Sequence, residues 1–283
     1  MNDQQTPPRL AIFACIGEAY DFMWSNRADF FRMSALPVLI LAFVHTVAFT
    51  VFPQTTDLPS VKAIATRETA AMFLYAMFGV AWHRRFLRHS EQTTFWEALR
   101  WDGRKTLFFL RFILAVVCAT LAALPPILIL MIGGGGMTLV SSAAGTVGMA
   151  PGHLLTFLIV IAFAVWLIVF TRMSIWLPAT AIDERYSFVG AWGLGRNNSW
   201  TLVGITLGAM LPLMLIISVA LSFVVSILVG LGIQTNLTGL FLAGLALGFA
   251  KYLALAAEIT ALSVAYQKLS RPTDPGMPIF RTD

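Results

Sequence analysis

Charge is the first thing that this sequence lacks. Only 12% of its 283 residues are Asp, Glu, Lys or Arg, whereas 58% are hydrophobic. Soluble globular domains carry about 25% charged residues, so this composition indicates a chain that is dissolved in lipid. The mean hydropathy of +0.79 supports the same interpretation. The composition therefore argues against a soluble enzyme or a soluble binding domain.

The side chains of catalytic and metal chemistry are also scarce. The two cysteines, Cys15 and Cys118, have no redox or metal spacing, and we expect them to be small buried hydrophobic residues. None of the four histidines pairs with Cys, Asp or Glu at ligand spacing, and no G-x-S-x-G motif occurs. His83 and His89 flank "HRRFLRH", which we interpret as a solvated, lipid-facing basic run. We therefore predict no catalytic residues, no metal site and no cofactor.

Long apolar runs are what the sequence does contain. A membrane-spanning helix needs about 20 predominantly apolar residues. Six runs approach or exceed this length, so we predict an all-α, polytopic membrane protein with six transmembrane helices. The runs are Phe31–Phe52, Ala65–Trp82, Leu107–Ile132, Leu154–Leu177, Leu202–Ile233 and Leu237–Tyr266.

Lysine and arginine lie almost entirely on one side of these spans. With a cytoplasmic N-terminus, fifteen of the nineteen basic residues face the cytoplasm and only Lys62 and Arg67 face the opposite side. The positive-inside rule therefore predicts a multi-pass protein of the bacterial inner membrane with both termini cytoplasmic. Anionic lipid headgroups account for the pI of about 9.6, so no nucleic-acid partner is expected.

A short aromatic-rich segment precedes the first, third and fifth spans. Aromatic residues on one face and charges on the other are typical of helices that lie in the headgroup plane. We expect three cytoplasmic interfacial amphipathic helices, each followed by a two-span hairpin, in a threefold repeat. Alternatively, cytoplasmic span ends simply collect tryptophan and arginine. The segments are "IGEAYDFMWSNRADFF", "TFWEALRWDGRKTLFF", which Thr94 would open as a capping box, and "SFVGAWGLGRNNSWTL".

The chain is expected to form a single membrane domain over residues 1–283. It divides into an N-terminal interfacial helix (1–30), the six-span bundle (31–266) and a cytoplasmic tail (267–283). The stretch "GGGGMTLVSSAAGTVGMAPG" predicts a flexible connection between spans three and four. Glycine pairs in spans five (Gly204, Gly208) and six (Gly244, Gly248) predict close helix packing.

An elbow, "LPATAIDERYSFVGAW", follows span four. We expect Pro178 to discourage continuation of the helix and to redirect the chain. Asp183 should then lie in water, and Ser187 can cap the next helical segment.

The elbow also carries a resemblance. The pattern R…LPA…[DE]…S…A resembles the membrane domain of bacterial glycerophosphodiester phosphodiesterases and related stand-alone six-span inner-membrane proteins. The resemblance is best over residues 172–202; it departs from the family at Asp183, usually a glutamate, and at Gly195, near which the family has a serine. It implies a membrane domain without the catalytic barrel, because only a short tail follows Tyr266, and hence no enzyme activity. The matching residues are Arg172, Leu177, Pro178, Ala179, Asp183, Ser187 and Ala191.

Ionisable residues within spans are functional hypotheses by default, and the candidate intramembrane polar site here consists of Arg111, Arg172, Lys251 and Glu258. Arg111, Arg172 and Glu258 lie at similar depth, so we expect Glu258 to pair with one or both arginines; the alternative is an anion or proton site at the inner mouth. Lys251 should lie near the bilayer centre with no carboxylate at its depth. His45 and Tyr75 are its candidate neighbours, in a polar cavity that binds an anionic group or in a structural bond.

These patterns predict a non-enzymatic accessory or scaffold protein that interacts with membrane lipids, with a membrane protein as an additional candidate partner. The alternative is a transporter of a small anionic solute or lipid that uses Lys251 and Glu258. Phosphodiester chemistry would rest on the resemblance alone. The predicted headgroup contacts are Arg84, Arg85, Arg88, Arg104 and Lys105.

Overall fold

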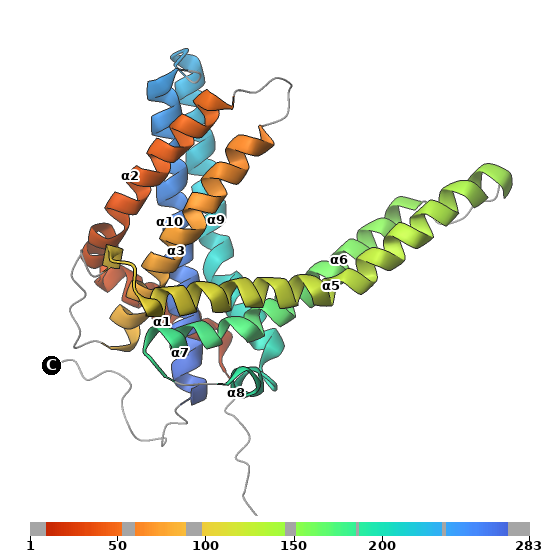
Figure 1. Ribbon diagram of the computed structural model, residues 1–283, viewed down its shortest axis with the longest axis horizontal. Helices are drawn as coiled ribbons and strands as arrows, with labels where there is room; N and C mark the ends of the chain where they lie inside the picture. The colour runs from red at the N-terminus through yellow and green to blue at the C-terminus, as the bar shows by residue number, and fades with distance from the viewer. Residues whose placement is uncertain are drawn as a thin grey trace, which may run out of the picture.

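The computed structural model describes residues 10–52, 60–88, 98–144, 151–184, 187–233 and 236–270, with the backbone alone for 129–144 and 151–155. Every regular element in these ranges is a helix (Figure 1). The helices are α1 (Ile12–Ser25), α2 (Arg27–Val51), α3 (Val61–Leu87), α5 (Gly103–Ala144), α6 (Pro151–Ser174), α7 (Trp176–Ala181), α8 (Phe188–Leu194), α9 (Ser199–Gly230) and α10 (Leu237–Ser270).

The prediction of an all-helical membrane protein is confirmed at this level. Each predicted apolar run falls on a long helix, with ends shifted by a few residues in most cases. Five segments are long and apolar enough to cross a membrane, whereas α3 is not among them although it has 27 residues. The five are Arg27–Val51, Gly103–Leu128, Thr156–Ala181, Ser199–Gly230 and Leu237–Ser270.

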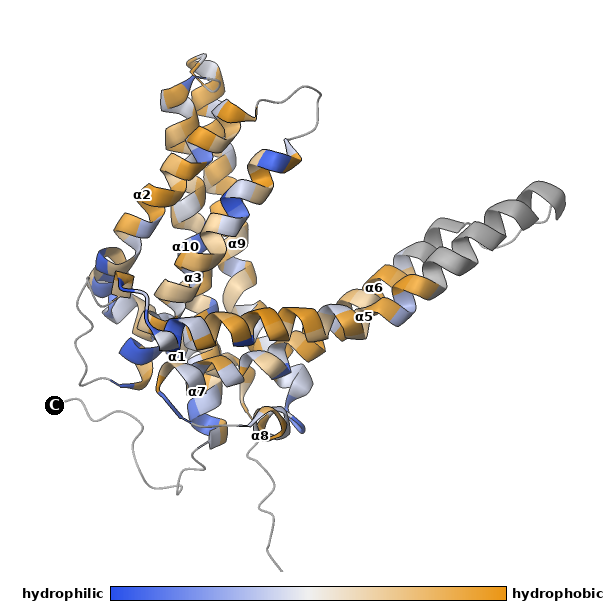
Figure 2. Cartoon of the chain, viewed as in Figure 1, coloured by the Kyte–Doolittle hydropathy of each residue, from blue (hydrophilic) through white to orange (hydrophobic). Residues whose placement is uncertain are grey.

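The long helices form two groups that meet at one end. Helices α2, α3, α9 and α10 make one bundle, and the antiparallel pair α5–α6 leaves its lower end at a steep angle (Figure 1). The pair touches the bundle where α5 meets α3 and α6 meets α9. Apolar residues predominate along the bundle and along the coloured part of the α5–α6 pair, and hydrophilic residues gather where the two groups join, near α7 and α8 (Figure 2). The junction is therefore where polar chemistry concentrates.

Helix α10 is the centre of the bundle and contacts α1, α2, α3 and α9. Gly244 allows α10 to approach α2 closely, because a Cβ at this position would lie only 2.9 Å from the Cα of Ala42. At Gly248 a Cβ would make an ordinary contact with Val38 at 3.4 Å. The predicted close packing is thus confirmed at Gly244, whereas Gly248 leaves room for a Cβ.

Helix α1 lies against α9 and α10 rather than standing apart from the bundle. Cys15 is fully buried at this contact, as expected, and burial is the main reason that the pKa of its thiol is raised. Tyr20 donates a hydrogen bond of 2.6 Å to the carbonyl oxygen of Ala209. On the opposite side of α1, Phe13 and Trp24 are exposed. One face of α1 therefore packs against the bundle, and the opposite face exposes aromatic side chains.

Two predictions of local structure are wrong. The first is the flexible connection after span three, because α5 continues through all four glycines of residues 133–136 and ends at Ala144. Glycine is frequent in membrane helices, where the backbone must satisfy its own hydrogen bonds, and no proline stops the helix there. Residues 145–150 lie outside the described part of the chain.

The second wrong prediction concerns Pro178, which does not end the helix. The chain turns at Ile175, and Pro178 lies inside the short helix α7, at its third residue. Proline is tolerated in a first helical turn, since those N–H groups have no partner within the helix. Helix α7 runs on to Ala181, and the redirection of the chain occurs after it. Thr94, the predicted N-terminal cap of the second interfacial segment, lies outside the described residues.

Candidate functional site

The end of α7 is set by Asp183, which adopts the left-handed conformation with a φ of 65°. The backbone N–H of Glu184 donates to the carbonyl of Ala179 at 2.9 Å, and that of Asp183 donates to Thr180 at 3.2 Å. These two bonds form a Schellman motif, in which glycine is the usual residue at the left-handed position. An aspartate there carries a backbone cost that glycine would not. The elbow therefore depends on a strained residue.

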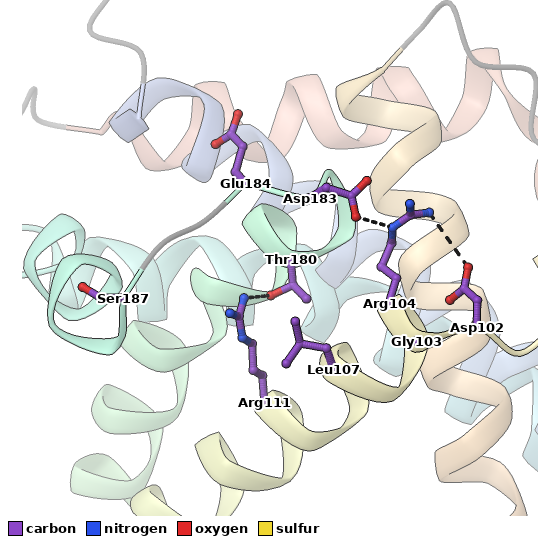
Figure 3. Close-up of a pocket in the computed structure, with 9 residues that line it drawn as sticks. All are labelled: Asp102, Gly103, Arg104, Leu107, Arg111, Thr180, Asp183, Glu184 and Ser187. Carbon is purple, nitrogen blue, oxygen red and sulfur yellow. Dashed lines mark hydrogen bonds and ion pairs between the residues drawn. The ribbon is translucent and has the colours of Figure 1, made fainter.

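Three arginines lie within 4 Å of the carboxylate of this residue, and Figure 3 shows the shortest of these contacts, the one with Arg104. Arg104 Nε lies 2.6 Å from Asp183 Oδ1, and Arg84 Nη1 lies 3.3 Å from Oδ2, with Arg88 Nη2 at 3.9 Å. Partial burial opposes ionisation, but the hydrogen bond and charge of Arg104 and the charge of Arg84 outweigh it, so the pKa of Asp183 lies below its ordinary value. The cluster joins α3, the start of α5 and the end of α7.

The same arginines satisfy the last carbonyl groups of α7. Arg84 donates to the carbonyl of Ala181 at 3.1 Å, and Arg88 donates to that of Ile182. Cations are favourable at a helix C-terminus for this reason. After the elbow, Ser187 Oγ accepts a hydrogen bond of 3.1 Å from the N–H of Gly190 and caps α8. A cleft of about 690 Å³ lies beside this cluster, lined by Asp102, Gly103, Arg104, Leu107, Arg111, Thr180, Asp183, Glu184 and Ser187.

The predicted headgroup contacts are therefore largely engaged within the protein. Arg85 Nε lies 2.8 Å from Asp29 Oδ2 and ties α3 to α2. Lys105 is 2% exposed and donates to the carbonyl of Arg100, so a headgroup contact is wrong for this residue. The basic run is therefore not simply solvated, because carboxylates approach it from distant helices, and sequence spacing does not reveal them.

The expected ion pair between Glu258 and an arginine is also wrong. Arg111 lies over the ring of Trp176, 4.2 Å from its centroid, and donates to Thr180 Oγ1. Arg172 lies 3.8 Å over the ring of Trp192 and donates to its carbonyl at 2.9 Å. Both guanidinium groups thus use cation–π contacts at the junction.

Lys251 has the carboxylate partner that the sequence did not suggest. Its Nζ lies 2.7 Å from Glu68 Oε1, and Arg67 contacts the same oxygen. His45 and Tyr75 line the adjoining crevice of about 10 Å³, so they are neighbours of Lys251 as expected. A crevice this small holds no solute, and the pair fastens α3 to α10.

A larger cavity lies where the α5–α6 pair meets the bundle. It has a volume of about 330 Å³, and apolar side chains of α3, α5, α6, α9 and α10 supply most of its wall. Phe108, Phe112, Trp166 and Phe170 give it an aromatic side. Glu258 also lines this space, and we call it the Glu258 cavity. Its size falls in the range of small-molecule sites, which are concave, apolar and contain few polar groups.

Several polar atoms around the Glu258 cavity have no hydrogen-bond partner. Among the described residues, no hydrogen bond or ion pair is made by the carboxyl group of Glu258. Tyr75 Oη, His83 Nε2 and Thr206 Oγ1 are buried and equally unpartnered. A buried polar group without a partner costs about 1–3 kcal/mol, and native proteins contain few of them. Three of the seven buried side-chain atoms without a partner in the described residues belong to residues that line this cavity, and a ligand bound there would supply their missing bonds.

Sequence reasoning identified Glu258 but missed the other polar residues. His83 was assigned to a solvated run, yet it is 1% exposed and binds Ser263 through Nδ1 at 2.6 Å. The signal lay in its position on the face of α3 that carries Tyr75 and Gly79, eight and four residues earlier. In the described part of the chain no three His, Cys, Asp or Glu side chains gather as metal ligands.

Comparison with protein-family models, with characterised proteins and with solved structures gives no match to this chain. The resemblance to the phosphodiesterase membrane domain therefore stays a prediction. The geometry of the Glu258 cavity and of the Asp183 cluster is the basis for the functional argument.

Proposed function

We propose that this chain is a non-enzymatic integral membrane protein that binds an amphiphilic, lipid-like molecule in the Glu258 cavity. The observation that carries the proposal is the set of unpartnered polar atoms on an apolar wall. A molecule with an apolar body and one polar end would fill the volume and pair those atoms. Binding would serve either an accessory role in the membrane or the transport of a lipid.

The same proposal includes the topology of the protein. We propose six spans, with α3 as the second, in the inner membrane of a bacterium and with both termini cytoplasmic. Support comes from the arginines that gather at the ends of α3 and α7 and at the start of α5. The exposed aromatic residues Trp24, Trp101 and Trp200 mark the membrane interface. Helices α1 and α8, each ahead of a hairpin, are consistent with interfacial helices in a threefold repeat.

Transport of a small anion through Lys251 has less support than binding at Glu258. Lys251 is paired with Glu68, and its crevice holds about 10 Å³. The Glu258 cavity has a volume of about 330 Å³, which is more than thirty times the volume of that crevice, about 10 Å³. The resemblance contributes no catalytic step to this proposal.

Photolabelling tests the proposal directly. The full chain is reconstituted in phosphatidylcholine nanodiscs and exposed to a long-chain alcohol that carries a photoreactive group. We expect saturable labelling of peptides from α3 and α10 that contain Ala76 and Glu258. Ala76→Phe, which fills the cavity, should remove this labelling, because Ala76 lines the space.

The matched control is Ala35→Phe, the same substitution at an exposed position of α2. It should leave the labelling unchanged. The proposal fails if the two variants label alike, or if the label spreads over the lipid-facing helix surfaces without saturating.

A further inference from the structure

The polar groups of the Glu258 cavity also determine which kind of polar end fits. This step rests on the proposed function, since it names the chemistry of the ligand in that same cavity. The groups that matter are the imidazole of His83 and the carboxyl group of Glu258, both on the cavity wall.

The proton on His83 can be assigned from its neighbours. Ser263 Oγ donates its one proton to the carbonyl oxygen of Ile259 at 2.8 Å, so towards His83 it can only accept. We therefore assign the ring proton to His83 Nδ1, which lies 2.6 Å from that oxygen. No carboxylate of the described residues lies within ion-pair distance of the ring, so a neutral imidazole is favoured in these apolar surroundings. The unpartnered Nε2 is then a hydrogen-bond acceptor.

The carboxyl group of Glu258 is the second polar group of the wall. Apolar surroundings keep it neutral while it has no partner, and its ionised form, which accepts hydrogen bonds, requires a compensating cation. The residues that line the described cavity include no lysine or arginine, and Arg111 and Arg172 are engaged with Trp176 and Trp192. A cation from outside the chain can meet this need.

The wall of the cavity favours the same charge. Trp166 and Phe170 are stacked with ring centroids 4.8 Å apart, and Phe112 meets Phe170 edge-on at 6.2 Å. Aromatic faces attract cations and do not attract anions. The apolar remainder of the cavity accommodates a hydrocarbon chain.

We propose that the Glu258 cavity binds the ammonium group of a long-chain primary amine. The ammonium supplies the positive charge for Glu258 and an N–H donor for His83 Nε2, and Tyr75 and Thr206 also line the cavity. A quaternary ammonium offers the charge without the donor, an alcohol offers the donor without the charge, and a fatty acid offers the wrong charge. The two requirements together distinguish these four classes.

Competition against the photoreactive alcohol measures this preference in the same nanodiscs. The competitors are dodecylamine, dodecyltrimethylammonium, dodecanol and dodecanoate, compared as mole fractions in the lipid. We expect dodecylamine to compete at least about tenfold better than dodecanol, because a charge-assisted hydrogen bond is about twice as strong as a neutral one. Dodecyltrimethylammonium should fall between them, and dodecanoate should compete least.

Glu258→Gln is the decisive variant. It should keep photolabelling by the alcohol, which shows that it folds, and it should lose the preference for dodecylamine over dodecanol. Glu184→Gln lies outside the Glu258 cavity and should keep the wild-type order. His83→Phe should bring dodecylamine and dodecyltrimethylammonium closer together.

The outcomes separate the two proposals. If the alcohol does not label the cavity in the wild type, the proposed function fails. If the alcohol labels but dodecylamine has no advantage, or if Glu258→Gln retains that advantage, the ammonium site alone is wrong. If Glu258→Gln loses alcohol labelling as well, the comparison of dodecylamine with dodecyltrimethylammonium in the wild type decides, and equal competition overturns the proposal.

Discussion

Substitution of Asp183 separates two contributions to the stability of the elbow, its ion pairs and its left-handed backbone. Asp183→Asn removes the charge and keeps a residue that tolerates a positive φ. Asp183→Gly removes the charge and the backbone cost together. Asp183→Ala removes the charge and increases the cost, because a Cβ without a local hydrogen bond is unfavourable there.

The magnitudes follow from the geometry. The side chain of Asp183 is 47% exposed, so solvent screens its two closest pairs with Arg104 and Arg84. Exposed pairs contribute about 0.2–1 kcal/mol each, which gives about 1 kcal/mol for the cluster. Left-handed backbone costs an ordinary L-residue about 1–2 kcal/mol. We therefore expect the free energy of unfolding to fall by about 1 kcal/mol in Asp183→Asn and by about 2–3 kcal/mol in Asp183→Ala, and to change little in Asp183→Gly.

Buried Cys15 provides the assay. In a Cys118→Ser background, a maleimide dye that fluoresces on reaction reports exposure of this thiol during thermal unfolding in detergent. Each kcal/mol of lost stability lowers the melting temperature by about 2–4 °C. The Asp183→Ala variant should therefore melt several degrees below Asp183→Gly, and Asp183→Asn should melt between them. Equal melting of Ala and Gly would show that the left-handed backbone carries no cost. If Asp183→Asn is as stable as the wild type, the ion pairs of Asp183 do not stabilise the elbow.

Three further results are expected from the same melting assay. Gly244→Ala should lower the melting temperature because its Cβ meets the backbone of α2, whereas Gly248→Ala should be neutral or slightly stabilising; similar effects at both sites would contradict the packing. Lys251→Met should destabilise by about 1 kcal/mol, because Arg67 still pairs with Glu68, and Glu68→Leu should cost less in the Lys251→Met background than in the wild type; equal costs would show that the pair is absent. Because the pKa of Asp183 is lowered, its ionisation stabilises the fold above the ordinary value of about 3.9 and is lost as the pH falls below it. The Asn variant should lack that part of the acid destabilisation, and identical profiles would refute the assignment.

Composition and hydropathy predicted the helices of this protein well. Lipid leaves the backbone no partners other than its own, so an apolar run of sufficient length becomes a helix. The ends of the helices were harder to predict. Helix α5 continues through glycines that would favour a turn in water, and α7 continues through Pro178 because that residue lies in a first helical turn.

The pairing of charges could not be predicted from the sequence. Lys251 and Glu68 are 183 residues apart, and their contact depends on how far α3 and α10 slide along each other. Asp183 was recognised as part of the elbow, but its three arginine partners come from two other helices. Hydropathy indicates that a residue lies within a span, but it does not indicate which neighbouring helix the side chain faces.

The Glu258 cavity itself was not predicted, and the sequence drew attention only to its carboxyl group. A carboxyl group within an apolar run indicated a site, because such groups are costly in lipid. The remaining polar groups of the wall are Tyr75, His83 and Thr206, which are common in ordinary helices. Their significance arises from the missing hydrogen bonds, which only the packed structure reveals.

Native mass spectrometry of the chain extracted from its own membrane tests the central claim most directly. We predict that the wild type and Ala35→Phe each retain one lipid-soluble molecule per chain, and that Ala76→Phe retains none. An identical set of masses for all three proteins would contradict the claim that the Glu258 cavity is a binding site.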